Sequence, residues 1–297
     1  MNRDEWLFYK VYLGRYAPQM DHACVQLSRQ LLEKLAPRRW FFMRYVDGGG
    51  PHVRMRWLGA EGRQEAEGET FQTLVEDLLC ELVFTPPSNY RPMVNLGHAP
   101  AMGDLSEAGD FAQAFAVKDE YHPEYEAFLG PELIETAHEV FQASSEIAVK
   151  VLGDELEEGP SRKSVAPLLM KIVIDELVAA EHAGEFLTAY QEYWMRRDGI
   201  NIEYLVADFE FKAMSLRDSG YRLDSVPPSQ EELATRWRHC LSSARAAYGD
   251  KVPDRRVFPD NLTFRYIHLM NNRLGITILD EGYLATVLKA FSDGGDW

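Results

Sequence analysis

The stretch "GGGPHVRMRW" at residues 48–57 places polar and apolar side chains in strict alternation after a run of glycines. His52, Arg54 and Arg56 fall on one side of the alternation, and the residues between them are apolar. Because successive side chains of a strand point to opposite faces, the pattern predicts a strand that lines one face with two guanidinium groups and an imidazole. A solvated face is the ordinary interpretation. The alternative is a pocket in which these groups bind an anion or polarise a carbonyl oxygen.

A hairpin near the N-terminus must position this strand. Two segments rich in aromatic and β-branched residues, 40–46 and 52–58, flank the loop "DGGGP" and predict an antiparallel pair. Residues 6–13, "WLFYKVYL", predict a further strand. Helical spacing of apolar residues predicts helices near 20–35, 70–84, 131–152, 165–195, 201–217, 229–246, 261–273 and 280–291. The predicted fold class is therefore α+β, with N-terminal antiparallel strands and a largely helical remainder.

The length of the chain bears on its domain organisation. With 297 residues it lies near the upper limit for a single hydrophobic core, and we expect one unit over residues 1–297. The polar segment "GDELEEGPSRKS", residues 153–164, is the candidate for an internal subdivision. A content of 46% hydrophobic and 26% charged residues is typical of a globular protein and argues against a disordered one.

Charge and hydropathy limit the partners and the location. The formal net charge of −16 repels phosphate, so we expect no DNA partner. No apolar run approaches the roughly 20 residues that cross a membrane, and the first residues lack the apolar core of a secretory signal. We therefore expect no membrane partner and a cytoplasmic location. The three separated cysteines, Cys24, Cys80 and Cys240, fit a reducing compartment and argue against a thiolate zinc site.

Common cofactor and catalytic motifs are absent from the sequence. It contains no phosphate-binding loop with a lysine, no GxGxxG after a strand, no HExxH and no GxSxG. The eight histidines are dispersed. We therefore expect neither a metal nor an organic cofactor.

Four segments, taken in order, resemble one protein family. They are "WLFYKVYL", "WFFMRYVDGGGPHVRMRW", "YHPEYEAFLGPELIETAHEVFQASSEIA" and "YIHLMNNRLGI". Together they are similar to the C-terminal glutamate-elimination domain of class I lantibiotic dehydratases and to its stand-alone relatives, the thiopeptide-type bacteriocin biosynthesis proteins. The four segments keep the family's order and span nearly the whole chain, so the resemblance implies the α+β fold of that elimination domain.

The resemblance also implies a chemistry. In these dehydratases a separate domain glutamylates Ser or Thr of a precursor peptide, and the elimination domain removes glutamate to leave dehydroalanine or dehydrobutyrine. Arginines can pair with the glutamyl carboxylate while a base removes the α-proton. By resemblance, Arg54, Arg56 and His268 match positions that the family uses. The family's Glu-x-x-Arg-Tyr-Gly-Gly pattern, however, reads "EYEAFLG" here, so Ala127 stands where an arginine is expected, beside Glu126.

This departure favours another branch of the family, the stand-alone pyridine synthases of thiopeptide biosynthesis. They join two dehydroalanines and an adjacent backbone carbonyl in a formal [4+2] cycloaddition, and loss of water and of the leader peptide gives a pyridine within a macrocycle. Such chemistry needs a pocket that holds two alkenes together, donors that polarise a carbonyl, and groups that transfer protons. A glutamate-binding arginine is not required, and neither is a cofactor.

The leading hypothesis is therefore a thiopeptide pyridine synthase that acts on a leader-bearing precursor peptide. Its expected catalytic residues are Arg54, Arg56 and His268, with Tyr121 and Glu124 as further candidates. The expected substrate-binding residues are Arg44, His52, Arg265, Asn272 and Arg273. We also predict that the strand arginines share a cleft with His268.

Two alternatives remain open. One is a stand-alone glutamate eliminase, and the other is a non-catalytic protein that binds the leader peptide. A dehydratase or glutamyl transferase is the expected protein partner beside the precursor. Leader recognition through strand addition at a sheet edge fits all three hypotheses.

Overall fold

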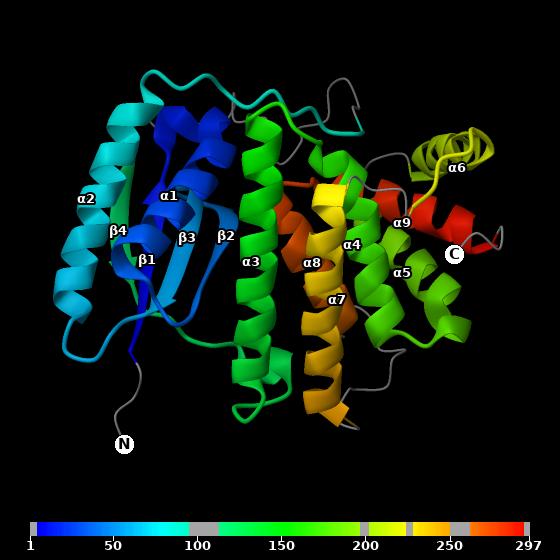
Figure 1. Ribbon diagram of the computed structural model, residues 1–297. Helices are drawn as coiled ribbons and strands as arrows, with labels where there is room; N and C mark the ends of the chain where they lie inside the picture. The colour runs from blue at the N-terminus through cyan, green and yellow to red at the C-terminus, as the bar shows by residue number, and fades with distance from the viewer. Residues whose placement is uncertain (1–4, 95–112, 197–201, 224–227, 250–261, 294–297) are drawn as a thin grey trace. The chain divides into compact units, whose positions relative to one another are not determined.

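The computed structural model describes residues 5–94, 113–196, 202–223, 228–249 and 262–293. The strands are β1 (Trp6–Tyr12), β2 (Trp40–Asp47), β3 (Gly50–Leu58) and β4 (Phe115–Asp119). The α-helices are α1 (Met20–Leu35), α2 (Gln64–Leu82), α3 (Ile134–Leu156), α4 (Arg162–Leu177), α5 (Ala183–Met195), α6 (Ile202–Asp218), α7 (Pro228–Tyr248), α8 (Leu262–Leu274) and α9 (Ile278–Asp293) (Figure 1). Three short 3-10 helices are η1 (Gly14–Gln19), η2 (Tyr125–Phe128) and η3 (Ala180–His182). The predicted α+β class is confirmed.

The chain forms two compact units. The first comprises residues 1–90, 100–124 and 137–159, and the second comprises residues 91–99, 125–136 and 160–297. The first unit holds the sheet with α1, α2 and nearly all of α3, and the second holds α4 to α9.

The sheet of the first unit is antiparallel, with the strand order β2-β3-β1-β4. The loop between β2 and β3 consists of Gly48 and Gly49, since Asp47 pairs with Gly50. Steric contact favours glycine at position 49, because a Cβ there would lie 2.6 Å from the ring of Tyr12. The two hairpin strands confirm the prediction, whereas β4 was not predicted. Four of its five side chains are exposed, so no alternation marks it, and its pairing with β1 defines it.

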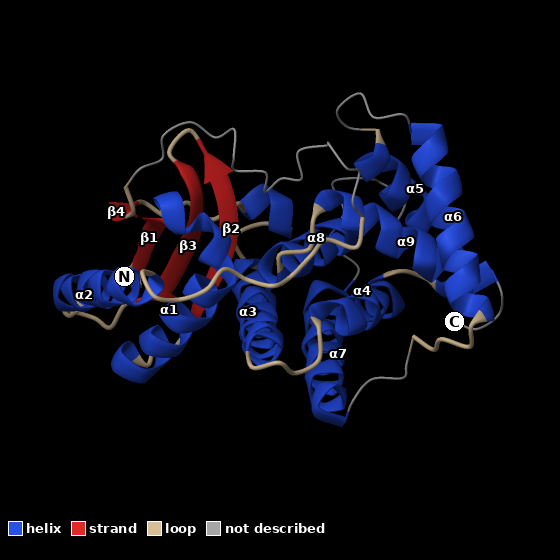
Figure 2. Cartoon of the chain, turned by 90° about the horizontal axis from the view of Figure 1, so that it is seen from above, coloured by secondary structure: helices blue, strands red, loops and turns tan. Residues whose placement is uncertain are grey.

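One face of the sheet is apolar and buried. Figure 2 shows α1 and α2 lying along the same side of the strands. The rings of Tyr9 and Trp57 lie 5.1 and 4.8 Å from that of Phe71 on α2. The indole N–H of Trp57 also donates to the buried carboxylate of Glu67 on α2. The apolar half of the alternation in β3 therefore forms the core, and His52, Arg54 and Arg56 lie on the opposite face.

Helix α3 closes one edge of this sheet. The backbone N–H of Phe42 on β2 donates to Ser145 Oγ at 3.2 Å, and that hydroxyl donates in turn to the Phe141 carbonyl at 2.8 Å. An edge-strand N–H is thus satisfied by a helix side chain. Strand β4 forms the other edge of the sheet.

The second unit is helical. Helices α5 and α6 both pack on α9, and α4 packs on α7 and α8. The helical zone expected over 165–195 is divided in two, because Val178 and Ala179 adopt extended backbone conformations between α4 and η3. The buried Arg162 guanidinium donates to the Leu274 carbonyl at 2.6 Å and so ties the start of α4 to the end of α8. Over the described ranges, no helix is long and apolar enough to cross a membrane.

A buried ion pair joins β2 to α1. Arg44 Nη2 lies 2.7 Å from Asp21 Oδ1, and Ser88 Oγ donates to the same carboxylate at 2.6 Å. Asp21 is buried, so its carboxylate is shielded from water. Arg44, which we expected to bind substrate, therefore has a partner that holds the fold together.

We expect Asp21→Asn to lower the free energy of unfolding by about 3 kcal/mol, because it removes the carboxylate that pairs with the Arg44 guanidinium in a shielded position. Urea denaturation measures the change. Glu192→Gln, which breaks the exposed pair with Arg196 on α5, serves as the control and should cost less than about 0.5 kcal/mol. Equal costs for the two variants would contradict this account of Arg44.

Candidate functional site

Arg56 lies in a box of aromatic rings on the polar face of the sheet. Its guanidinium carbon is 4.3 Å from the ring centre of Phe8, 5.1 Å from that of Tyr121 and 5.4 Å from that of Phe41. The register explains two of these contacts, since Arg56 is paired with Phe8 of β1 and with Phe41 of β2. The residue is only 8% exposed, so this face is not simply a solvated one.

The polar groups of Arg56 are incompletely satisfied. Within the described part of the chain, Nε and Nη1 of Arg56 are buried and have no hydrogen-bond partner. Burial lowers the pKa of Arg56 to about 10, which still leaves the group charged at neutral pH. A buried cationic donor without an acceptor is costly. An oxygen atom of a ligand would supply the missing acceptor.

Tyr121 links this arginine to a buried histidine. The Tyr121 hydroxyl lies 2.9 Å from His138 Nε2, and His138 is 1% exposed. Trp6 and Phe41 pack on the imidazole with ring centres 4.6 and 5.8 Å away. Glu124, the other candidate beside Tyr121, is exposed, and its negative charge acts to raise the pKa of Arg56. His138 was not singled out from the sequence, because a histidine on the buried face of a helix has the same spacing as any core residue.

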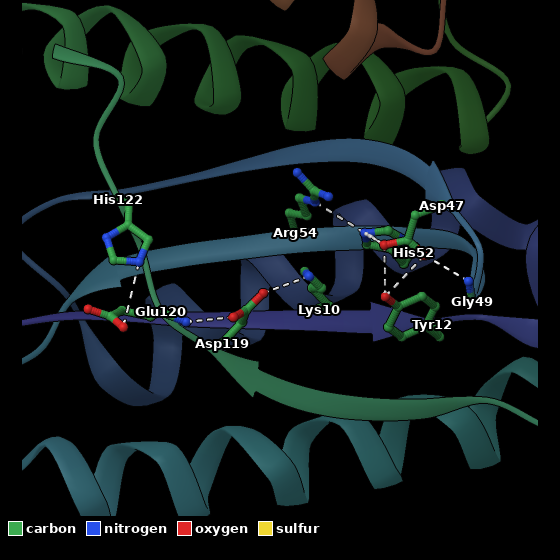
Figure 3. Close-up of polar contacts among 9 residues, drawn as sticks. All are labelled: Lys10, Tyr12, Asp47, Gly49, His52, Arg54, Asp119, Glu120 and His122. Atoms are coloured by element: carbon green, nitrogen blue, oxygen red, sulfur yellow. Dashed lines mark hydrogen bonds and ion pairs between the residues drawn. The ribbon is translucent and has the colours of Figure 1, made fainter.

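A second network, made of hydrogen bonds on the same face of the sheet, fixes the orientation of the Arg54 side chain (Figure 3). His52 is fully buried and bonds through Nδ1 to the Gly50 carbonyl at 2.9 Å, while its Nε2 accepts from Arg54 Nε at 3.1 Å. Burial lowers the pKa of His52, and the neutral ring suits both bonds. The Arg54 guanidinium stacks on the Tyr45 ring at 3.4 Å. His52, expected to bind substrate, is therefore placed to orient Arg54.

The hairpin loop and the neighbouring strands complete this network. Asp47 accepts from the Gly49 N–H at 2.9 Å and from the Tyr12 hydroxyl at 3.0 Å. Burial raises the pKa of Asp47, but these bonds and the nearby cations outweigh it and leave the pKa below the usual 3.8. Lys10 pairs with Asp119 at 2.6 Å between β1 and β4, and this bond lowers the pKa of Asp119.

The second unit contains the predicted His268 on α8. His268 Nδ1 lies 2.9 Å from Oε1 of Glu281 on α9, and the hydroxyl of Tyr190 on α5 donates to the other oxygen of that carboxylate. Glu281 and Tyr190 are completely buried, whereas the His268 side chain is 32% exposed and packs on Trp194 at 4.9 Å. Burial and the Glu281 charge raise the pKa of Tyr190 well above 10.0, so this phenol remains a donor.

This arrangement resembles the carboxylate–imidazole pairs of acid/base catalysts. When Nδ1–H donates to the carboxylate, the lone pair of the neutral ring is on Nε2, and the carboxylate stabilises the ring when it takes up a proton. Glu281 and Tyr190 were not singled out from the sequence. Their positions 13 and 78 residues from His268 follow no recognised motif, and only helix packing brings them together.

The other predicted residues of α8 mostly serve its own structure. Arg273 is fully buried and donates through Nη1 to the Leu269 carbonyl at 3.0 Å. The Asn272 carbonyl accepts from the Gly275 N–H at 3.0 Å where the helix ends. The Arg265 guanidinium lies 6.0 Å from the ring centre of Phe128.

The candidates thus form two groups. The first unit contains Arg44, His52, Arg54, Arg56, Tyr121 and Glu124. The second unit contains Arg265, His268, Asn272 and Arg273. The shared cleft of the strand arginines and His268 stays a prediction. Among the residues with described positions, no cluster of His, Cys, Asp or Glu has the size to hold a metal ion.

The depressed pKa of His52 makes stability dependent on pH. The unfolded chain, with a histidine pKa near 6.5, binds a proton more readily than the folded chain, so stability is lost as the pH falls through about 6.5. The loss cannot exceed about 1.4 kcal/mol per pH unit. We expect His52→Gln to show a shallower loss between about pH 7 and pH 5 in urea denaturation. His22, whose pKa is also lowered, is present in both proteins. Parallel profiles would show that His52 is not buried as described.

The Glu281 carboxylate depends on both of its donors. We expect Tyr190→Phe to lower the free energy of unfolding by about 1–3 kcal/mol, because one buried carboxylate oxygen loses its hydroxyl partner. Tyr204→Phe, at a position that is 72% exposed, is the control and should be nearly neutral. The effects of Tyr190→Phe and Glu281→Gln should differ from additivity by at least about 0.5 kcal/mol. Strict additivity would be inconsistent with the bond.

Comparisons with known proteins agree on the fold. Residues 6–291 match the family described as lantibiotic biosynthesis dehydratase C-term. A comparison with curated proteins gave no match. The tRNA-dependent lantibiotic dehydratase MibB from Microbispora sp. 107891 is 19% identical, with a TM-score of 0.55 over 99% of this chain. This chain spans only 28% of MibB.

Two further solved structures match along nearly their whole length. The pyridine synthase TbtD from thiomuracin biosynthesis is 15% identical with a TM-score of 0.63, covering 98% of this chain and 99% of TbtD. TsrL is 14% identical with a TM-score of 0.57, covering 99% of this chain and 95% of TsrL. These identities show likeness in fold alone. The resemblance noted in the sequence is confirmed, and the chain belongs to the lantibiotic dehydratase C-terminal family.

Proposed function

We propose that this protein closes the central pyridine of a thiopeptide by a formal [4+2] cycloaddition in a ribosomally made precursor. The observation that carries the proposal is the buried Arg56 guanidinium, whose Nε and Nη1 lack acceptors in the described part of the chain. A peptide carbonyl oxygen is an acceptor that such donors can polarise. Similarity in fold to the pyridine synthase TbtD supports the same reaction class.

The chemistry balances without an external oxidant. Polarisation of the backbone carbonyl favours its iminol form, which together with one dehydroalanine makes an azadiene. Two carbon–carbon bonds then form to the second dehydroalanine, one at the former carbonyl carbon and one between the two methylene carbons. Loss of water and of the leader peptide as its amide makes the ring aromatic. The protein must hold the alkenes in contact and move protons in the two eliminations.

The named residues divide these tasks. Arg56 polarises the carbonyl oxygen, and Arg54, oriented by His52, supplies a second cation on the same face of the sheet. His268, held by Glu281, transfers protons through Nε2 in the elimination steps. Tyr121, beside Arg56, is the further donor.

A stand-alone glutamate eliminase is the second candidate, because a guanidinium that lacks acceptors also suits a glutamyl carboxylate. Ala127 argues against it: this residue of η2 stands where the family pattern has an arginine, and the exposed Glu126 beside it adds negative charge. Ala127→Arg should therefore raise glutamate elimination if this interpretation is right.

The test uses two substrates in separate incubations. One is a synthetic leader-bearing peptide with two dehydroalanines, and the other is its glutamylated counterpart. We expect the first to lose water and the leader amide and to gain the absorbance of a pyridine, while the second keeps its mass. Loss of glutamic acid from the second peptide, with the first unchanged, would overturn the proposal in favour of the eliminase.

Arg56→Gln should lower kcat/KM on the dehydroalanine peptide by about 100-fold, because it removes a charged donor from the developing oxyanion. Arg56→Lys should recover little, since an ammonium lacks the forked geometry of a guanidinium. Arg39→Gln, at a partly exposed arginine that pairs with Glu139 in the same unit, is the matched control and should retain full activity. Full activity of folded Arg56→Gln would exclude a role in polarisation.

A further inference from the structure

The second unit contains a cavity of about 520 Å³, within the range of about 300–1,000 Å³ that is typical of ligand pockets. It lies between the start of α4, helices α6 and α9, and the residues Met93 and Val94. Every residue that lines it belongs to the second unit, whereas Arg56 belongs to the first. The tasks assigned above to Arg56, Arg54 and His268 leave this cavity without a role.

The inner part of the cavity is apolar. The lining residues that are buried from solvent are aliphatic or aromatic, and they include Pro167, Phe209, Leu284 and Val287. The ring of Phe209 on α6 packs edge-to-face on that of Tyr283 on α9, with ring centres 5.3 Å apart. An apolar group of a ligand would therefore gain free energy by leaving water for this space.

Two hydrogen bonds hold the walls of the cavity in place. Arg217 Nη1 donates to the Ala290 carbonyl at 3.3 Å and ties the end of α6 to α9. The backbone N–H of Val94 donates to Asp280 Oδ1 at 2.7 Å, which fixes the segment before α9 in space to that helix. The cavity is thus formed by the packing of the unit, and a ligand need not create it.

The polar groups that line the cavity are donors. Tyr221 and Tyr283 are half-buried, and within the described ranges neither phenol has a hydrogen-bond partner. Burial raises the pKa of both phenols above 10.0, so each is a neutral donor at physiological pH. Lys163 and Lys212 add two ammonium groups. Among the described lining residues there is no aspartate or glutamate.

This lining contrasts with the chain as a whole, which has 47 acidic and 31 basic residues and a net charge of −16. Lys212 pairs with Asp208 at 2.6 Å, but both side chains are partly exposed and the ammonium has further protons to donate. An anion is repelled by most of the protein surface and meets cations and neutral donors at this cavity. The cavity is therefore complementary to an apolar group that is attached to a carboxylate.

We infer that the cavity binds an acidic and apolar segment of the leader peptide, an inference that rests on the proposed function for the identity of the peptide. An apolar side chain fills the space beside Phe209, and a neighbouring carboxylate lies at Lys163 and Lys212. The proposed reaction consumes a leader-bearing precursor and releases the leader, so the enzyme must distinguish peptides that carry one. Binding of a remote segment also helps to orient the part of the peptide that reacts.

Fluorescence anisotropy of the dye-labelled leader of the synthetic precursor measures this binding step without any reaction. We expect Lys163→Gln and Lys212→Gln each to raise Kd by about fivefold, and we expect the affinity of the wild type to fall as salt is added. Lys150→Gln is the matched control, because Lys150 is as exposed as Lys212 and also pairs with an aspartate one helical turn away. It should leave Kd unchanged.

The charge of the peptide provides the reciprocal test. A leader in which glutamine and asparagine replace the acidic residues should bind the wild type more weakly by about tenfold. Its Kd should then be the same for the wild type and for the two lysine variants, because the carboxylate that they recognise is absent. Equal sensitivity of both leaders to the lysine changes would overturn the inference.

A larger side chain tests the apolar part of the cavity. Leu216 is half-buried in the lining, and Leu216→Trp should raise Kd for the leader by at least about tenfold because the indole occupies the space. Circular dichroism checks that the variant is folded, and the surface lysine variants decide the matter if it is not. Leader binding that all these variants leave unchanged would overturn the inference in favour of the sheet edge. Binding of hexanoate in place of the leader would assign the cavity to a small acid and also overturn it.

Turnover separates this inference from the proposed function. On the dehydroalanine peptide, the lysine variants should raise KM by about fivefold and leave kcat unchanged, because they weaken only the binding of a remote segment. A wild type that binds the leader as described but forms no pyridine would defeat the proposed function alone. A wild type that forms pyridine, with lysine variants that match it in Kd and KM, would defeat the inference alone.

Discussion

The constraint on which the first unit depends is a guanidinium held out of water. Arg56 is placed by strand register between Phe8 and Phe41, with Tyr121 beside it. Aromatic faces attract a cation but supply no hydrogen-bond acceptor. The fold therefore stabilises the charge while leaving donor capacity unused in the described residues. Such a site lowers the stability of the fold but can bind an oxygen atom, a combination that is common at active sites.

The buried arginines of this protein illustrate the difference between structural and functional charge. Arg44 pairs with Asp21, Arg162 donates to the Leu274 carbonyl, and Arg273 donates to the Leu269 carbonyl. The first two interactions connect elements of the fold, and the third lies within α8. The sequence alone did not reveal these roles, and Arg44 and Arg273 were expected to bind substrate, because the identity of a partner depends on tertiary packing.

The local parts of the fold could be predicted from the sequence. The alternation in β3 and the glycine loop before it encode a hairpin through interactions between near neighbours. Helix α2 begins at Gln64, before the expected residue 70. Its first turn is polar and carries Glu65 and Glu67, so apolar periodicity did not reveal it. The residues of the site could be predicted only in part. Arg56 and Tyr121 were found by family pattern, whereas His138 and Glu281 resemble ordinary helix residues until their partners are known.

The order of the strands has a consequence for how the sheet assembles and opens. The β2–β3 hairpin closes through two glycines, whereas β4 must join β1 from far along the chain, with Asp119 opposite Phe8. Pairings of long sequence separation form late, and an edge strand with one neighbour is the first to exchange its amide protons. Because Tyr121 follows β4 directly, detachment of that strand would also release the phenol from its place beside Arg56. Part of the surroundings of Arg56 therefore depends on the pairing of β4 with β1.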